Sequence, residues 1–412
     1  MKKLVYLFLL IYFPTFGQFT IFNSHNSNLK SNFCSRLTID LFDNPWIGHA
    51  DIGASIYKDN KFTNFNNTNS PLNGEFISFL LPDEDKIYLS EFEHGIFKFE
   101  NNLWERVIDI PDFSIYGMFK QQNSNYMWIS TKYSGVFRYN LQSKEIVNFS
   151  GFNELPTNYT FRITGDAKGQ IYVGTGYEGA VKYDGTKWEV FNTENSGLPN
   201  DDVYAVACDK NNNTWFGTFD GLAKLNIDGT WELYNTQNSD LPDNYIRNII
   251  CKDEIVIIAT ARGGLAIFNT LNNKWKVFNT SNSNIPSDQV WDIALNSKGD
   301  LWIALLEHGL AKLSNIFENP LIDSMSTIIK KPIVFFDNTD RSIYVTVKVE
   351  KDTHYSLFLL DVLGKKIKEF DFIGSGNPEL QRISVQNYPS AIYILVFKNG
   401  SSVLSEKFLI YD

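Results

Sequence analysis

The stretch NDDVYAVACDKNNNTWFGTFDGLAKLNIDGTWELYN, residues 200–235, determines how the rest of the chain is interpreted. It contains four short runs rich in aliphatic and aromatic residues, at 203–208, 214–218, 221–225 and 231–235. The polar turns DKNNN, FDG and NIDGT separate these runs. Strands of about five residues joined by such turns predict antiparallel hairpins rather than helices. The stretch therefore predicts one four-stranded sheet, whose strands we call a, b, c and d in chain order.

Copies of this pattern recur throughout residues 34–314. The b strands share an aromatic or aliphatic pair followed by a small residue, in WIGH (46–49), YLSE (88–91), WIST (128–131), YVGT (172–175), WFGT (215–218), IIAT (257–260) and WIAL (302–305). A glycine follows each motif, at Gly53, Gly95, Gly135, Gly179, Gly221, Gly264 and Gly309, which indicates a turn with positive φ. Repeats of this length with four antiparallel strands predict an all-β fold, a seven-bladed β-propeller.

The seventh copy lacks its strand d. After strand c at 309–313 no aromatic strand follows, whereas the first residues after the leader, FTIFN at 19–23, match a strand d. We therefore expect the N-terminal strand to pair with 309–313 and to close the last blade. Closure removes the exposed sheet edge that an open ring would present.

Composition and charge are those of an exported β protein. Residues 1–17 have two lysines, a short apolar run and small residues, which is the layout of a secretory signal peptide. The formal net charge of -10 disfavours nucleic acid as a partner, and no apolar run is long enough to predict a transmembrane segment. Three cysteines do not make a disulfide framework, so we expect free, buried thiols.

The repeat W-I/F-G-T followed by G-L-A and Y/F-N-T-x-N-S-x-L-P resembles the two-component regulator propeller repeat. The resemblance is strongest at 172–313, and His49 and Glu91 replace the usual Thr in the first two copies. In that family the repeats commonly form the periplasmic sensor of hybrid histidine kinases that detect polysaccharides. The sequence shows no kinase or receiver segment, so phosphotransfer is not expected of this chain.

A smaller β unit is expected after the propeller. Alternating runs at 343–349, 355–361, 392–398 and 403–410 predict a small β-sandwich. The segments LFLLDVLGKKI (357–367), IYILVFKNG (392–400) and the terminal SEKFLIYD resemble the C-terminal sorting domain of type IX secretion cargo. This resemblance implies a cell of the Bacteroidetes type, the type IX machinery as a partner, and a protein that is released or attached to the outer surface. We expect a signal peptide at 1–17, a propeller at 18–317, a linker at 318–330 and the sorting domain at 331–412.

Candidate binding residues follow from the propeller geometry. The b–c turns and the loops from strand d to the next strand a lie on one face, because successive strands alternate in direction. Side chains that vary between copies there, beside apolar neighbours that do not vary, are free of the packing constraint. Rings and charged groups of this kind suit sugar or peptide ligands. The candidates are Tyr133, Phe161, Tyr177, Tyr204, Phe219, Arg247, Arg262, Trp291, His94 and His308.

Several alternatives remain open at this stage. The same residues also fit ordinary amphipathic loops. The two EHG motifs at 93–95 and 307–309, together with His49, suggest a metal site, although their spread over three blades argues against convergence. No nucleophile motif, phosphate loop or cofactor motif is visible. The favoured function is a secreted or surface propeller that binds an extracellular ligand, with a carbohydrate polymer first; a polysaccharide lyase or hydrolase and a structural adhesin are the alternatives.

Overall fold

The computed structural model describes residues 19–108, 110, 114–317, 333–337, 342–348, 354–362, 364–373, 378–385, 388–399 and 402–410. The chain divides into two compact units, 1–325 and 326–412, each described here by itself. The predicted signal peptide at 1–17 and the predicted linker at 318–330 lie outside the described residues.

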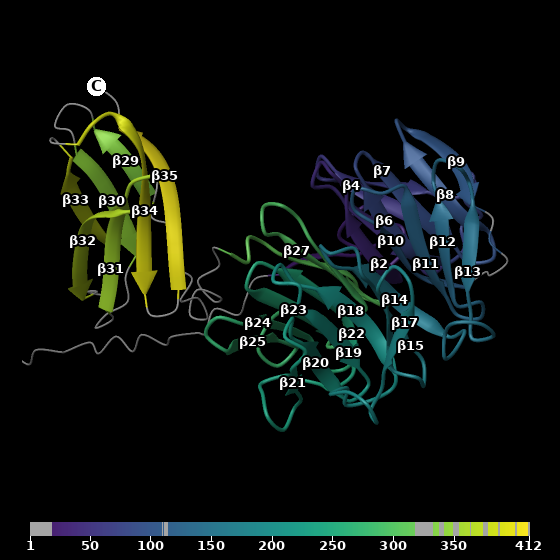
Figure 1. Cartoon of the computed structure of the whole chain (residues 1–412). Helices are drawn as coiled ribbons and strands as arrows, with labels where there is room; N and C mark the ends of the chain where they lie inside the picture. The colour runs from purple at the N-terminus through teal and green to yellow at the C-terminus, as the bar shows by residue number, and fades with distance from the viewer. Residues whose placement is uncertain are drawn as a thin grey trace, which may run out of the picture. The chain divides into compact units, whose positions relative to one another are not determined.

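The first unit contains seven four-stranded antiparallel sheets among its described residues (Figure 1). Blades 1 to 3 consist of β2 (Cys34–Ile39), β3 (Pro45–His49), β4 (Ala54–Lys58) and β5 (Lys61–Phe65); β6 (Ile77–Asp83), β7 (Lys86–Glu91), β8 (Gly95–Glu100) and β9 (Leu103–Ile108); and β10 (Ile115–Lys120), β11 (Tyr126–Thr131), β12 (Val136–Asn140) and β13 (Ile146–Phe149). Each sheet keeps the chain order of its strands, as the repeat predicts.

The remaining blades follow the same order, apart from the last. Blades 4 to 6 consist of β14 (Thr160–Gly165), β15 (Ile171–Thr175), β16 (Ala180–Tyr183) and β17 (Trp188–Phe191); β18 (Val203–Cys208), β19 (Thr214–Thr218), β20 (Gly221–Leu225) and β21 (Trp231–Tyr234); and β22 (Ile246–Lys252), β23 (Ile255–Thr260), β24 (Leu265–Asn269) and β25 (Lys274–Phe278). Blade 7 combines β26 (Asp292–Leu295), β27 (Leu301–Leu305) and β28 (Gly309–Leu313) with β1 (Thr20–Phe22) from the N-terminus.

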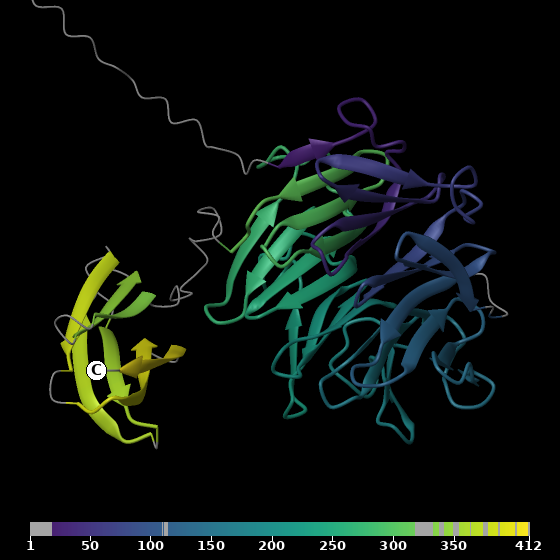
Figure 2. The same cartoon turned by 90° about the horizontal axis from the view of Figure 1, so that it is seen from above.

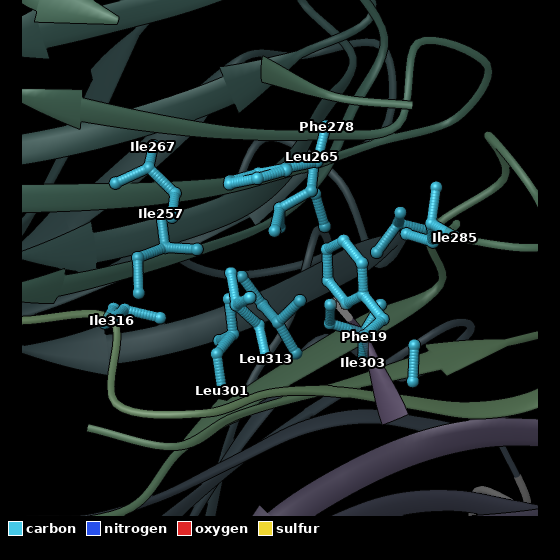
Figure 3. Packing of buried hydrophobic residues seen from close by; sticks show 14 of the residues in the cluster. Phe19, Ile257, Leu265, Ile267, Phe278, Ile285, Leu301, Ile303, Leu313 and Ile316 are labelled. Atoms are coloured by element: carbon cyan, nitrogen blue, oxygen red, sulfur yellow. The ribbon is translucent and has the colours of Figure 1, made fainter. Parts of the chain in front are cut away.

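The predicted closure by the N-terminal strand is confirmed. β1 runs antiparallel to β28, with Ile21 opposite Ala311, and Figure 2 shows the purple first strand beside the green strands of the last sheet. Phe19 is buried and meets Phe278 edge-to-face at 5.5 Å between ring centroids, inside the core drawn in Figure 3. The Phe19 amide donates to Asn284 Oδ1 at 2.8 Å, and Asn284 Nδ2 donates to the Phe19 carbonyl at 2.9 Å.

The a strands form the inner wall of the ring. Each contacts the a strands of both neighbouring blades, and β2 contacts β26, so the circle closes through seven inner strands. The tryptophans of the b strands are core residues as predicted, since Trp128, Trp215 and Trp302 are at most 2% exposed. The repeated glycine also has the predicted conformation. At Gly309 φ is 79°, and a Cβ atom would lie 2.2 Å from the Phe22 carbonyl oxygen.

The second unit contains two antiparallel sheets, of three and four strands. The strands are β29 (Ile333–Asp337), β30 (Ser342–Lys348), β31 (His354–Leu360), β32 (Lys366–Ile373), β33 (Pro378–Ser384), β34 (Ala391–Asn399) and β35 (Ser402–Ile410). The four predicted runs match β30, β31, β34 and β35 within one residue at each end. Residues of both sheets, including Ile343, Leu357 and Leu395, share one buried cluster, as expected for a small sandwich.

Candidate ligand-binding pocket

A bulge at the start of the inner strand sets the geometry of the candidate site. In the sheets of blades 1, 2, 3, 5 and 6 the pairing of strands a and b skips one residue, for example between Ile246 and Asn248 of β22, and β14 has a similar shift. A bulge leaves the extra residue unpaired and redirects its side chain. In blade 7 the corresponding residue, Trp291, immediately precedes β26, and its amide donates to the Ala304 carbonyl at 3.0 Å.

The b–c turns and the starts of the a strands share one face, as predicted. In blade 4 the amide of Gly176 in the b–c turn donates to the carbonyl of Tyr159, just before strand a, at 3.0 Å. In blade 6 the amide of Ala261 donates to the Tyr245 carbonyl at 2.9 Å. These bonds repeat from blade to blade, so the variable residues lie around one end of the ring.

A pocket of about 340 Å³ opens among the inner strands and the loops that precede them. This volume lies at the small end of the range for ligand sites. The pocket is lined by Arg36, Tyr116, Tyr159, Phe161, Arg162, Tyr204, Tyr245, Arg247 and Trp291. Four of the ten sequence candidates, Phe161, Tyr204, Arg247 and Trp291, are therefore brought together, and each is at the bulge position of its blade.

The pocket wall is a chain of aromatic rings from blade 3 to blade 6. Ring centroids are 5.6 Å apart between Tyr116 and Phe161, 4.7 Å between Phe161 and Tyr204, and 4.8 Å between Tyr204 and Tyr245. None of these contacts is a face-to-face sandwich, since the interplanar angles are 72°, 47° and 43°. Burial raises the pKa of the Tyr204 hydroxyl well above its usual value, so this hydroxyl is a neutral donor at physiological pH. The wall thus combines ring faces with hydroxyl groups.

Arg247 and Trp291 extend the wall into blades 6 and 7. The guanidinium carbon of Arg247 lies 4.3 Å from the centroid of the Trp291 ring, within the range of a cation–π contact. Burial lowers the pKa of Arg247 from its ordinary value, while the nearby Tyr245 and Asp243 act in the opposite direction. The Arg247 Nη1 atom and the Trp291 Nε1 atom are buried and make no hydrogen bond with described residues.

Three further candidates form an exposed rim around this wall. Tyr133, Tyr177 and Phe219 are 63%, 72% and 42% exposed. Tyr177 lies 6.0 Å from the ring of Tyr159, and Phe219 lies 5.1 Å from that of Tyr245. They do not line the pocket, but Tyr177 and Phe219 contact pocket tyrosines and so lie at its entrance.

The last three candidates are not brought into the pocket. The Arg262 guanidinium lies 3.6 Å from Asp243 Oδ1 and the residue remains on the rim. The His308 ring is within 3.0 Å of the Leu306 carbonyl in its own turn, and the His94 amide donates to the Glu91 carbonyl at 3.1 Å. In the described part of the chain no three His, Cys, Asp or Glu side chains are grouped as a metal site.

Five pocket residues were not among the candidates: Arg36, Tyr116, Tyr159, Arg162 and Tyr245. Tyr116 occupies the same bulge position as Phe161, so alignment of the copies contained the signal for it. Arg36 and Arg162 follow the bulge position by one residue. Their direction depends on a bulge that the period-two pattern of a regular strand does not reveal.

Asp292 connects four blades behind the pocket. Its carboxylate is almost fully buried and accepts from Arg162 Nη2 at 2.7 Å and from the Leu37 amide at 3.0 Å. Asn248 Nδ2 also donates to it. Arg36 is held by its own bonds, from Nε to the Ser78 carbonyl at 2.7 Å and from Nη1 to the Ser35 carbonyl at 2.8 Å. These contacts fix the guanidinium groups from behind.

The two departures from the repeat at His49 and Glu91 have structural roles. Where blades 3 to 6 have Thr, the fully buried His49 places Nε2 within 2.7 Å of Ser55 Oγ and Nδ1 within 3.8 Å of Cys34 Sγ. The buried Glu91 carboxylate accepts from the amides of Asn73, Gly74 and Glu75 at 2.9–3.0 Å and holds the loop before strand a. Neither side chain lines the pocket.

The buried His49 predicts an acid-sensitive propeller. Burial lowers the His49 pKa from 6.5 to about 3, so the unfolded chain binds this proton first as the pH falls. Its contribution to stability is complete above pH 6.5 and is lost as the pH falls toward 3. Between about pH 7 and about pH 5 the free energy of unfolding, measured with urea, should fall by about 2 kcal/mol more in the native chain than in His49→Thr. Equal losses would contradict this role.

Two family models match parts of the chain. Residues 341–411 match the secretion system C-terminal sorting domain, and residues 197–220 match the two component regulator propeller. Comparison with curated protein sequences gave no significant match. No helix in the described ranges has the length and apolar character that crossing a bilayer requires.

Solved structures share the fold at low sequence identity. The extracellular domain of BT3049, a hybrid two component system protein from B. thetaiotaomicron, is 18% identical with a TM-score of 0.66; the match covers 94% of this chain and 57% of that one. PorZ, a surface component of the type-IX secretion system of Porphyromonas gingivalis, is 15% identical with a TM-score of 0.57, over 93% of this chain and 60% of that one. A streptogramin B lyase is 14% identical with a TM-score of 0.59, over 72% and 96%.

The chain thus spans 57% and 60% of the length of the first two of these structures. The ring of seven sheets, the matched repeat and the matched terminal segment agree with one another. The terminal segment directs export to the cell surface or release from the cell. The chain thus carries a two component regulator propeller repeat within its ring of seven sheets and a secretion system C-terminal sorting domain at 341–411.

Proposed function

We propose that the pocket binds a sugar unit of an extracellular carbohydrate polymer. The aromatic wall supports this proposal, since aromatic faces stack on the apolar faces of sugar rings while hydroxyl and guanidinium groups bond the sugar hydroxyls. Tyr204, Arg247 and Trp291 provide these groups side by side. The rim residues Tyr177 and Phe219 extend the aromatic surface outward, where neighbouring units of a polymer can lie.

The relatives are consistent with an extracellular binding role. One is the extracellular domain of a hybrid two component system, and another is a surface component of a secretion system. The domain boundaries at 18–317 and 331–412 are part of this proposal: the propeller carries the binding face, and the terminal unit directs its export.

Binding is favoured over catalysis by the chemistry of the pocket wall. Its described lining contains neither a carboxylate nor a histidine, the groups that most often serve as acid and base. The Asp292 carboxylate, which pairs with the lining residue Arg162, is buried and already accepts bonds from Arg162 and the Leu37 amide. A hydrolase would need a pair of carboxylates that the described lining does not offer.

Glycan-array binding tests the proposal with two variants of the full chain. Trp291→Ala should weaken binding of the recognised glycan about tenfold, the equivalent of one buried stacking contact. Tyr177→Ala, on the exposed rim, should weaken it about threefold. Phe42→Ala is the matched control, because Phe42 is 71% exposed in the a–b turn at the other end of blade 1. Unchanged binding in both Trp291→Ala and Tyr177→Ala would refute the proposal.

A further inference from the structure

We propose that the sugar unit recognised by this pocket carries an anionic group, a carboxylate or a sulfate, which binds to the arginines of the wall. This inference rests on the proposed carbohydrate function and specifies its substrate class. It is carried by the positions of Arg36, Arg162 and Arg247 and by the donors that remain unpaired at the wall.

The charge of the pocket is opposite to that of the protein. The whole chain has a formal net charge of -10, whereas the described lining contains three arginines and no acidic residue. Asp292 behind the wall balances one of these charges through Arg162. The next pair outward, Arg262 and Asp243, is neutral in sum. Two positive charges therefore remain in a partly desolvated cavity, where an anion is attracted more strongly than in water.

Two donors at the wall are not paired with an acceptor in the described part of the chain. Arg247 Nη1 and Trp291 Nε1 are both buried without a hydrogen-bond partner among the described residues, and the two side chains are in contact. A buried donor without an acceptor has an energetic cost, which a ligand oxygen removes. A carboxylate or sulfate has several oxygens and accepts charge-assisted bonds from a guanidinium. A neutral hydroxyl offers one oxygen and no charge.

The arginines also act on one another. Burial lowers the pKa of Arg36 to about 10, and the next largest cause is repulsion by Arg162, with a further contribution from Arg247. Like charges held this close are stabilised by a counter-ion between them. Arg36 and Arg162 are held by bonds to the Ser78 carbonyl and the Asp292 carboxylate, so both guanidinium groups are oriented before an anion arrives.

The test compares three probes with the full chain in titration calorimetry: oligogalacturonate, chondroitin sulfate oligosaccharides and neutral galactan oligosaccharides. Preference for either anionic probe over galactan by about tenfold or more is expected, since a charge-assisted bond has about this effect on affinity. Tighter binding of oligogalacturonate identifies a carboxylate. If chondroitin sulfate binds more tightly, comparison with unsulfated chondroitin separates the sulfate from the carboxylate that both carry. Equal affinity for galactan would overturn the anionic inference and leave the carbohydrate function standing. Binding of none of the three, with none of a wider glycan array, would count against both.

Arg247→Gln is the decisive variant, because Arg247 Nη1 is buried without a hydrogen-bond partner among the described residues. It should weaken binding of the anionic probe at least tenfold more than it weakens binding of galactan, and so remove the preference. Arg247→Lys, which keeps the charge and loses the planar fork, should retain part of the preference. Lys276→Gln is the control, since it removes one positive charge from β25, the outermost strand of the same blade. An unaltered preference in Arg247→Gln would overturn the inference.

Discussion

Deletion of residues 18–23 is expected to lower the melting temperature of the propeller by about 10 °C or more. The deletion removes Phe19 from the core of blade 7, and truncation of a buried phenylalanine alone costs about 3–5 kcal/mol. It also removes Phe22, which stacks on Trp302 at 5.4 Å. For a domain of this size about 2 °C is lost for each kcal/mol. Differential scanning calorimetry of the full chain measures the effect.

Two point variants separate the contribution of the Phe19 side chain from that of strand pairing. Phe19→Ala should account for most of the loss, because its side chain is 4% exposed. Thr20→Ala changes an exposed residue of the same strand and should leave the melting temperature within a degree or two. If the full deletion melted like the native chain, the first strand would not be what completes the ring.

Replacement of Asp292 by Ala should reduce the free energy of unfolding by about 3–5 kcal/mol. The variant leaves the Arg162 guanidinium, the Leu37 amide and the Asn248 side-chain amide without their shared acceptor. The cost arises less from the lost attraction than from a charge that stays buried without a partner. Urea unfolding followed by tryptophan fluorescence gives the difference.

The double variant Asp292→Ala with Arg162→Met provides the internal check. Once the unpaired charge is also removed, the loss should be smaller than the sum of the two single losses, with a coupling of about 0.5–3 kcal/mol. Glu105→Ala breaks an exposed pair with Lys98 and should cost less than about 1 kcal/mol. Additive losses for Asp292 and Arg162 would show that the pair does not act as a unit.

The fold could be predicted from the sequence because seven copies of one strand pattern can be compared within the chain. Each copy tests the others, and strands 203–208, 214–218 and 221–225 were predicted with the bounds that the structure gives. Even the exception, a seventh copy without its last strand, identified 19–23 as the missing piece. In the second unit there is no such comparison, and β29, β32 and β33 were not predicted.

The residues of the pocket could be predicted only in part, again by comparing the copies. Variation between copies pointed to Phe161, Tyr204, Arg247 and Trp291, because the preceding residues Val203, Ile246 and Val290 stay apolar and β-branched. It did not separate side chains that point inward from those on the outer turns, such as Arg262 and His308. Arg36 and Arg162 were missed since their direction depends on the bulge, a feature of pairing rather than of composition.

The strand exchange in blade 7 also imposes an order on how the molecule is made. Thr20–Phe22 are synthesised before the other described strands of the propeller, whereas their partner Gly309–Leu313 is the last of these strands to be synthesised. Until then the earliest segment has no sheet to join. A chain truncated anywhere before residue 309 lacks the partner of its first strand, so the propeller cannot close. Pairing of these two strands therefore requires that the whole propeller has been synthesised.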